Sequence, residues 1–281
     1  MSCIRSHRGH LPYLDEVSAI MMEENVLRDL RESLISHGRV WHMGTLQREE
    51  KGWESHEGDG LSVSLDPDIW RRLARLSGSL YQLEKEQAAF LDAYHCFSLP
   101  PLMRAVWKWG LREQYVERRK VYRVDWYDFE EENWRRFSFL SGPEARAEYR
   151  SLRLTTPQDV RYNTFVGYVP TNKMRLRAHH RALPLAFVRD FALSFYAQDH
   201  LPEIDGLWWE EQHDPNAFSA PRGVIFTHQL SSWKCFACPR DVTLPRCAQM
   251  AWPSDGHPMT SVADDQTAKI GCALDAGLPT L

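Results

Sequence analysis

The sequence predicts an α+β fold, because segments with the period of a helix are interspersed with segments that have the period of a strand. Residues 14–37 carry apolar side chains at a rough 3.6-residue period with charges between them, which is typical of an amphipathic helix. Residues 120–130 alternate in side-chain character as a strand does, and residues 134–140 are expected to pair with them. No Gly-x-Gly-x-x-Gly fingerprint or phosphate-binding loop opens a helix, which argues against ordinary dehydrogenases and nucleotide triphosphatases.

The first half of the chain is expected to begin with that helix, and Gly38 lies where a helix stops. Asp66 can cap a later helix, and Pro67 fits its first turn, where the missing N–H group costs nothing. The other elements expected in this half are strands at residues 39–46, 61–65 and 80–83, a helix end at Gly78, and a loop or short helix ending near Tyr94.

The second half is expected to add a core helix and several short strands. Phe187, Phe191 and Phe195 stand four residues apart after Pro184, so they form one apolar stripe that faces the core. Residues 141–180 are polar and give few strong signals. The other elements expected are a helix within residues 99–119 and strands at residues 165–169, 206–210 and 224–227.

Composition and charge are those of a globular protein with room for a sizeable core. The chain has 281 residues, of which 43% are hydrophobic and 26% charged, and its formal net charge is −4. This total excludes a polycation, although the basic run at residues 175–181, with His179 and His180, offers a local grip on pyrophosphate or nucleic acid. The 11 tryptophans are expected mainly in the core, with the alternative that some line a pocket for a flat ring.

The chain is expected to be cytoplasmic and to avoid membranes. No segment approaches the roughly 18 uninterrupted apolar residues of a membrane span, and no apolar stretch follows the basic residues 1–8. Most of the six cysteines are therefore expected to be free thiols. Cys235, Cys238 and Cys247 could bind zinc with a fourth ligand, but a second tight ligand pair is missing, so no metal is predicted.

Chemistry is concentrated in three short windows. Ser62 and Ser64 lie two residues apart and share one face of their strand. Consecutive glutamates point to opposite faces, so only one of Glu210 and Glu211 can face a pocket; Glu211 is favoured because it shares the parity of apolar residues 207 and 209. The windows are Trp41-His42-Met43-Gly44-Thr45, Gly60-Leu61-Ser62-Val63-Ser64-Leu65-Asp66-Pro67 and Asp205-Gly206-Leu207-Trp208-Trp209-Glu210-Glu211.

Together these windows resemble the three-part NAD site of ADP-ribosyltransferases. The resemblance covers roughly residues 39–227, and it implies a split, mostly antiparallel β-sheet core of the ADP-ribosyltransferase type with flanking helices. One departure is that Met43 lies between the histidine and the glycine of the first motif. The expected organisation places this catalytic domain at residues 39–230, after an N-terminal helical segment at residues 1–38. A loosely docked or disordered tail is expected at residues 231–281, where Pro, Ser, Asp, Gly and Thr dominate and the periodicity fades.

The resemblance also implies a role for each window. NAD is the expected cosubstrate, and His42 would hold its adenosine ribose. A glutamate, Glu211 or else Glu210, would be the catalytic carboxylate, since cleavage of the nicotinamide–ribose bond develops positive charge at the sugar. The full set expected to bind NAD is His42, Met43, Gly44, Thr45, Ser62, Ser64 and Trp70.

The function expected on this basis is transfer of ADP-ribose from NAD to a macromolecule, either a protein or a nucleic acid. By analogy with such enzymes, the protein would be a toxin, an effector or a participant in phage–host conflict, with an antitoxin or a host target protein as a partner. Two alternatives remain open. The first is an NAD glycohydrolase that uses water as the acceptor, and the second is a non-enzymatic module that binds protein or nucleic acid through its aromatic surface.

Overall fold

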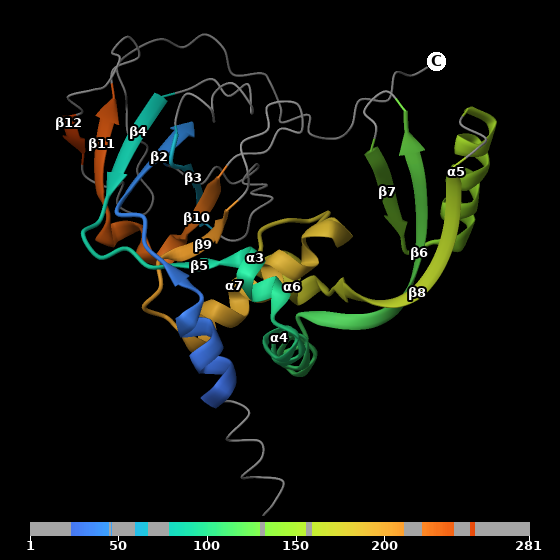
Figure 1. The fold of residues 1–281 in the computed structure, drawn as a ribbon, viewed down its shortest axis with the longest axis horizontal. Helices are drawn as coiled ribbons and strands as arrows, with labels where there is room; N and C mark the ends of the chain where they lie inside the picture. The colour runs from blue at the N-terminus through green and yellow to red at the C-terminus, as the bar shows by residue number, and fades with distance from the viewer. Residues whose placement is uncertain are drawn as a thin grey trace, which may run out of the picture.

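The computed structural model describes two β-sheets joined through a layer of helices (Figure 1). None of the described helices is long and apolar enough to cross a membrane. The described residues are 24–44, 46, 60–66, 79–129, 133–155, 159–210, 221–238 and 248–250.

The larger sheet, which we call the body sheet, has nine strands within the described residues, in the order β1-β5-β9-β10-β3-β2-β4-β11-β12. Neighbouring strands are antiparallel except β5 and β9, which run parallel. This confirms an α+β fold with a mostly antiparallel sheet. The strands are β1 Leu34–Ile35, β2 Arg39–Gly44, β3 Gly60–Ser64, β4 Ser79–Glu84, β5 Phe90–Asp92, β9 Gly206–Trp209, β10 Arg222–Phe226, β11 Lys234–Cys238 and β12 Ala248–Met250.

Helices cover one face of the body sheet, which we call the helical face (Figure 1). Local signals start several of these helices. Prolines occupy the first turn of α4, and the Asp92 carboxylate caps α3 by accepting a hydrogen bond from the backbone N–H of His95 at 3.0 Å. The helical elements on this face are residues 24–32, α3 Ala93–Ser98, α4 Pro100–Arg112, α6 Asn172–Arg177, η1 Leu185–Phe187 and α7 Val188–His200. The short helix η2 Thr227–Ser232 instead packs Leu230 against the opposite face.

Side chains of the body sheet alternate between two separate apolar clusters. Leu207 and Trp209 belong to the cluster beneath the helices, together with the phenylalanines of α7. Trp208, which lies between them, packs on the opposite face with Phe90 and Trp233. Both faces of β9 are therefore buried, and every residue of that strand is inaccessible to solvent.

The smaller sheet forms an arm that extends from the body between α4 and α6 (Figure 1). Its strands are ordered β7-β6-β8, and all pairs are antiparallel. The backbone N–H of Thr171 donates to the carbonyl of Tyr115 at 3.0 Å, so the chain leaves and re-enters the body at one place. We call residues 116–170 the arm; its elements are β6 Val116–Asp128, β7 Asn133–Phe139, α5 Gly142–Thr155 and β8 Val160–Pro170.

Many expected elements occur with different ends. The strands predicted at residues 39–46, 61–65, 80–83, 206–210 and 224–227 correspond to β2, β3, β4, β9 and β10. The pairing of residues 120–130 with 134–140 is confirmed by β6 and β7. The helix within residues 99–119 ends at Arg112, and β6 begins four residues later, after Gln114 adopts a positive φ of 59°. The helix expected after Asp66 lies outside the described residues.

Four expectations differ from the structure. The helix expected over residues 14–37 ends at residue 32, and Leu34–Ile35 form strand β1 before Gly38. Residues 142–155, which carry few sequence signals, form α5, and β8 is much longer than the strand expected at residues 165–169. The loosely docked tail expected from residue 231 is wrong for its first residues, because β11 pairs with β4 along its whole length. The Trp233 side chain that precedes β11 is only 2% exposed, which fixes this segment to the body.

Candidate functional site

His42 lies at a place where two neighbouring strands of the body sheet part. Within the described residues, β2 pairs with β4 along six residues but with β3 only between Trp41 and Ser64. Beyond that pair the His42 side chain bridges the two strands, with Nδ1 2.8 Å from the carbonyl oxygen of Ser62. The ring is 8% exposed and stacks on Tyr81, its partner on β4, with ring centroids 6.3 Å apart. His42 is therefore held in one orientation from two strands.

Gly44 is the next residue on the same face of β2, and its backbone requires glycine. Its φ of +134° lies in a region that L side chains rarely adopt. A Cβ atom added there would lie 3.4 Å from His42 Nε2. Gly44 thus allows the backbone to change direction at the end of β2, and the edge of the His42 imidazole lies next to the Gly44 backbone. Met43 between them is buried at 4% exposure and points to the helical face.

The predicted serines do not meet His42 through their hydroxyl groups. Because Trp41 and Ser64 are cross-strand partners, their side chains share one face, and His42 points to the other. The Ser64 hydroxyl instead donates to the carbonyl of Pro221 at 3.1 Å. Ser62 contributes its backbone carbonyl, rather than its side chain, to the His42 environment. The expectation that a serine hydroxyl shares a pocket with His42 is corrected by this register.

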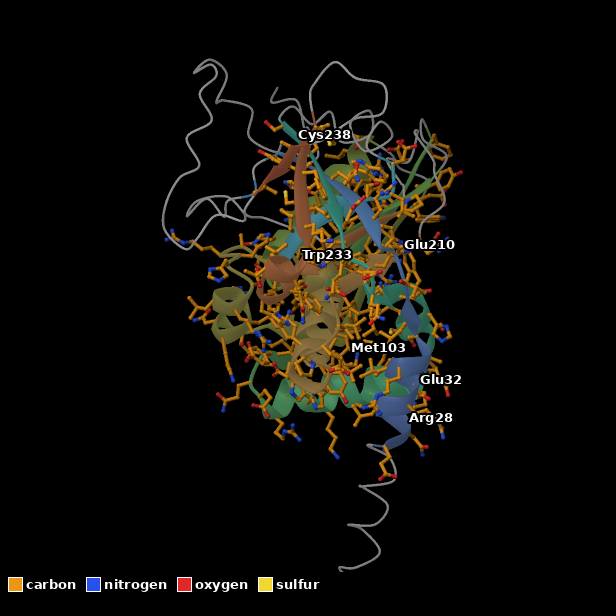
Figure 2. All side chains as sticks on the ribbon, turned by 90° about the vertical axis from the view of Figure 1, so that its left-hand side faces the viewer. Arg28, Glu32, Met103, Glu210, Trp233 and Cys238 are labelled. Carbon is orange, nitrogen blue, oxygen red and sulfur yellow. The ribbon has the colours of Figure 1, made fainter. Side chains whose placement is uncertain are left out.

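Glu210 lies on the same face of the body sheet as His42. Trp208 pairs with Gly223, and the strand pairings place both of these on the face that carries His42. The indole Nε1 of Trp208 donates to Glu210 Oε2 at 2.8 Å, which draws the carboxylate onto that face. Figure 2 marks Glu210 at the margin of the body and Trp233 in its interior.

The parity argument that favours Glu211 is not supported by this arrangement. Leu207 and Trp209, whose parity Glu211 shares, point to the helical face. The face that carries His42 has Trp208 and Glu210. Glu211 itself, like Thr45 and Trp70, lies outside the described residues.

His37 adds a titratable group beside Glu210 that the sequence reasoning missed. Its ring lies 4.3 Å from the Trp208 ring and 6.1 Å from that of Phe90. Burial lowers the pKa of His37, and the nearby Glu210 carboxylate opposes this by raising it. The buried Nε2 atom of His37 has no hydrogen-bond partner among the described residues.

Gly223 permits the close packing that positions Trp208. A Cβ atom at Gly223 would lie 2.2 Å from the Trp208 ring, so the indole lies directly across the glycine backbone. The sequence shows Gly223 beside an apolar segment, but only the pairing of β9 with β10 shows that the glycine makes room for Trp208. Tyr81, His37 and Gly223 are the residues of this region that the sequence patterns did not single out.

The cysteines of β11 do not converge. Cys235 and Cys238 stand three residues apart on one strand and so point to opposite faces. Cys235 is a free thiol whose pKa is raised to about 11 by burial, whereas Cys238 is disulfide-bonded and lies near the outer end of β11 (Figure 2). Cys96 is the other free thiol among the described residues. The zinc alternative for Cys235 and Cys238 is disfavoured by this geometry.

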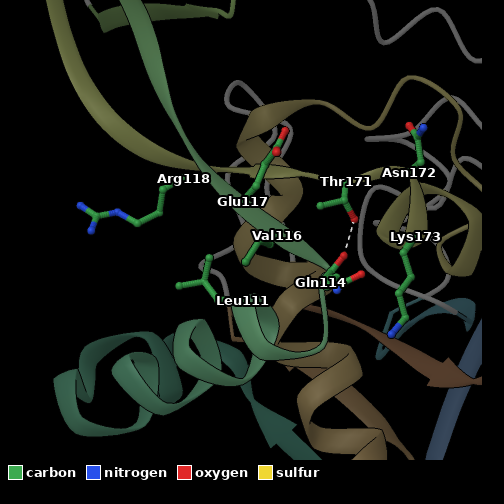
Figure 3. A pocket seen from close by; sticks show the side chains of 8 residues that line it. All are labelled: Leu111, Gln114, Val116, Glu117, Arg118, Thr171, Asn172 and Lys173. Atoms are coloured by element: carbon green, nitrogen blue, oxygen red, sulfur yellow. Dashed lines mark hydrogen bonds between the residues drawn. The ribbon is translucent and has the colours of Figure 1, made fainter.

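A cavity of about 500 Å³ lies at the base of the arm, apart from His42 and Glu210 (Figure 3). Thr171 Oγ1 donates across it to the carbonyl of Gln114 at 2.6 Å. None of the residues predicted for the NAD site lines it. Its lining residues are Leu111, Gln114, Val116, Glu117, Arg118, Thr171, Asn172 and Lys173.

Comparisons with protein-family models, with curated proteins and with solved structures give no match to this chain.

Proposed function

We propose that the protein is an NAD-dependent ADP-ribosyltransferase of the split-sheet type suggested by the sequence. The observation that carries this proposal is the position of His42 and Glu210 on one face of one sheet, although they come from opposite ends of the folded chain. The parting of β2 from β3 at His42 supports it, because a split between strands gives a ligand access to the interior of a sheet.

The roles follow from the chemistry of nicotinamide transfer. His42, held by the Ser62 carbonyl and Tyr81, would orient the ribose of NAD. Glu210, positioned by Trp208, would stabilise the positive charge that develops at the anomeric carbon as nicotinamide leaves with the bonding electron pair. An acceptor nucleophile then bonds to that carbon and loses its proton. His37, with its orphaned ring nitrogen, would offer a further polar contact on the same face.

The test measures nicotinamide released from NAD by the purified protein, with host-cell extract as a source of acceptors. Glu210→Gln should lower the rate by roughly 100-fold or more, as loss of a charge-stabilising group does. His42→Ala should raise KM for NAD more than it lowers kcat, because its role is binding. Glu203→Gln and His95→Ala change the same residue types at exposed positions and should leave the rate unchanged.

A third glutamate variant separates the two candidates for the catalytic carboxylate. Glu211→Gln should retain most of the activity, because the structure directs Glu210 toward the His42 face. Loss in Glu211→Gln with retention in Glu210→Gln would overturn the assignment of Glu210. An absence of nicotinamide release, together with no thermal stabilisation of the protein by NAD, would overturn the proposed function.

A further inference from the structure

The arm sheet has one covered face and one open face. Helix α5 packs on the covered face, where Gly142 lies against the Tyr122 ring and Tyr149 contacts Tyr162 at 5.8 Å. Because Tyr122 points to α5, the alternation of β6 turns Arg123 away from it. No helix or strand in the described part of the chain packs along the outer half of that opposite face. We call it the open face; it carries Arg123, Tyr127, Trp134, Arg136, Arg161 and Phe165.

Aromatic rings on the open face are exposed to solvent. Phe165 is 44% exposed and Trp134 is 39% exposed. Tyr127 pairs with Trp134 across β6 and β7, with ring centroids 5.7 Å apart. Large apolar side chains gathered on one exposed face of a monomer usually mark an interaction surface. Three rings on an exposed sheet face provide planes on which other flat rings can stack.

Guanidinium groups lie between and over these rings. Arg161 stands over the Trp134 ring at 4.2 Å, and Arg123 stands over the Phe165 ring at 5.8 Å. Asp125 is only 9% exposed at its side chain and receives both Arg123 Nε and Arg136 Nε at 2.9 Å. Among the described residues of the outer open face, three arginines therefore accompany one carboxylate, Asp125, which two of them enclose. This part of the open face thus carries an excess of positive charge, although the whole chain has a net charge of −4.

We propose that the open face of the arm binds single-stranded nucleic acid. Unstacked bases find rings to stack on in Trp134, Tyr127 and Phe165, while the arginines meet the phosphates. A duplex hides its base faces and would use only the arginines, and an acidic peptide would leave the exposed rings without flat partners. The proposal does not depend on the NAD chemistry, because it concerns binding by a separate sheet.

The experiment is a fluorescence-anisotropy titration of the full-length protein against a labelled deoxythymidine oligonucleotide of about 10 nucleotides, without NAD. Trp134→Ala and Phe165→Ala should each raise Kd by roughly tenfold, since stacking contributes about 1–3 kcal/mol per base. Arg161→Ala should also weaken binding and should reduce the dependence of Kd on salt. Matched controls on α5, Leu154→Ala and Arg150→Ala, remove an exposed apolar and an exposed basic side chain away from the open face and should leave Kd unchanged.

Four outcomes would contradict nucleic-acid binding by the open face. The proposal is overturned by a lack of binding at low salt, or by equal loss of affinity in the α5 controls and the open-face variants. Equal affinity for duplex and single strand, or a polyglutamate peptide or an anionic vesicle that competes as well as the oligonucleotide, would also overturn it. Far-UV circular dichroism of every variant separates loss of binding from loss of folding, and a variant that unfolds is replaced by Trp134→Leu or Phe165→Leu.

Discussion

Strand β9 of the body and strand β8 of the arm each pair with an antiparallel neighbour, but the burial of their side chains differs. All four residues of β9 are buried; Leu207 and Trp209 belong to the cluster beneath the helices, and Trp208 belongs to the cluster on the opposite face. In β8 the central residues are exposed, including Phe165 at 44% and Val166 at 60%. The body sheet has cores on both faces, so a polar group there must find a partner inside the protein. Within the described residues, the outer half of the arm sheet is covered by a helix only on the α5 side, so its other face can meet a ligand.

Two buried aspartates show the same difference. Asp205 in the body is 0% exposed; its carboxylate accepts hydrogen bonds from Lys85 Nζ at 2.7 Å, Trp233 Nε1 at 2.9 Å and the Ala89 N–H at 2.9 Å. Asp125 in the arm is enclosed only by two arginines that are themselves partly exposed. Asp205 joins segments that are distant in sequence, whereas Asp125 joins neighbouring strands of one sheet.

The largest effect is expected from removing the body carboxylate. Asp205→Ala leaves the Lys85 ammonium group and the Trp233 indole N–H without their buried acceptor, and it should lower the free energy of unfolding by about 3–5 kcal/mol. Asp125→Ala should cost only about 1 kcal/mol, because water can solvate Arg123 and Arg136. Urea denaturation followed by circular dichroism measures both. Equal losses in the two variants would contradict the contrast between the sheets.

A smaller effect with a pH dependence is expected at Asp190 on α7. Burial raises its pKa, and the hydrogen bond from Trp209 Nε1 at 3.0 Å opposes this only in part. A raised pKa means that the folded state holds the proton to a higher pH than the unfolded state does. The carboxyl group therefore contributes stability below its unfolded pKa of about 3.9, and that contribution is lost as pH rises through the folded pKa.

The Asp190→Asn variant tests this linkage. Its free energy of unfolding relative to the wild type should rise as pH increases from about 4, and the difference should level off above the raised pKa. Asp199→Asn provides a control, since Asp199 is paired with Arg177 at 2.9 Å at the protein surface. A difference for Asp190→Asn that stays constant across the pH range would show that this carboxyl titrates alike in both states.

Local signals in the sequence predicted most strands but not the faces they present. The pairing of β6 with β7 was predictable because alternation and a short connection are local properties. The orientation of Glu210 was not, because β9 is apolar on both faces and an inward side cannot be chosen from Leu207 and Trp209 alone. The parting of β2 from β3, which gives His42 its position, depends on pairings between segments that are far apart in the chain.

The two missed segments have different physical causes. Helix α5 is rich in arginine and glutamate and buries only Gly142 and Ala145, so it lacks the apolar stripe by which a helix is usually found. Strand β11 follows a polar stretch, and its docking depends on Trp233, whose indole reaches Asp205 from 28 residues away. Helix α5 was missed because its local sequence pattern is weak. Strand β11 was missed because its position depends on a contact between distant residues, which a local pattern cannot predict.

The smallest effect is expected from the rings of the arm, and it separates stability from binding. Trp134→Ala removes a ring that is 39% exposed, whereas Trp208→Ala would empty a fully buried site against Gly223. The arm variant should therefore lower the free energy of unfolding by less than about 1 kcal/mol, against about 3–5 kcal/mol for the body variant. Urea denaturation of the two variants under one set of conditions measures the difference. A large loss in Trp134→Ala would mean that the open face stabilises the arm, and its exposed rings would then no longer indicate a surface kept for a ligand.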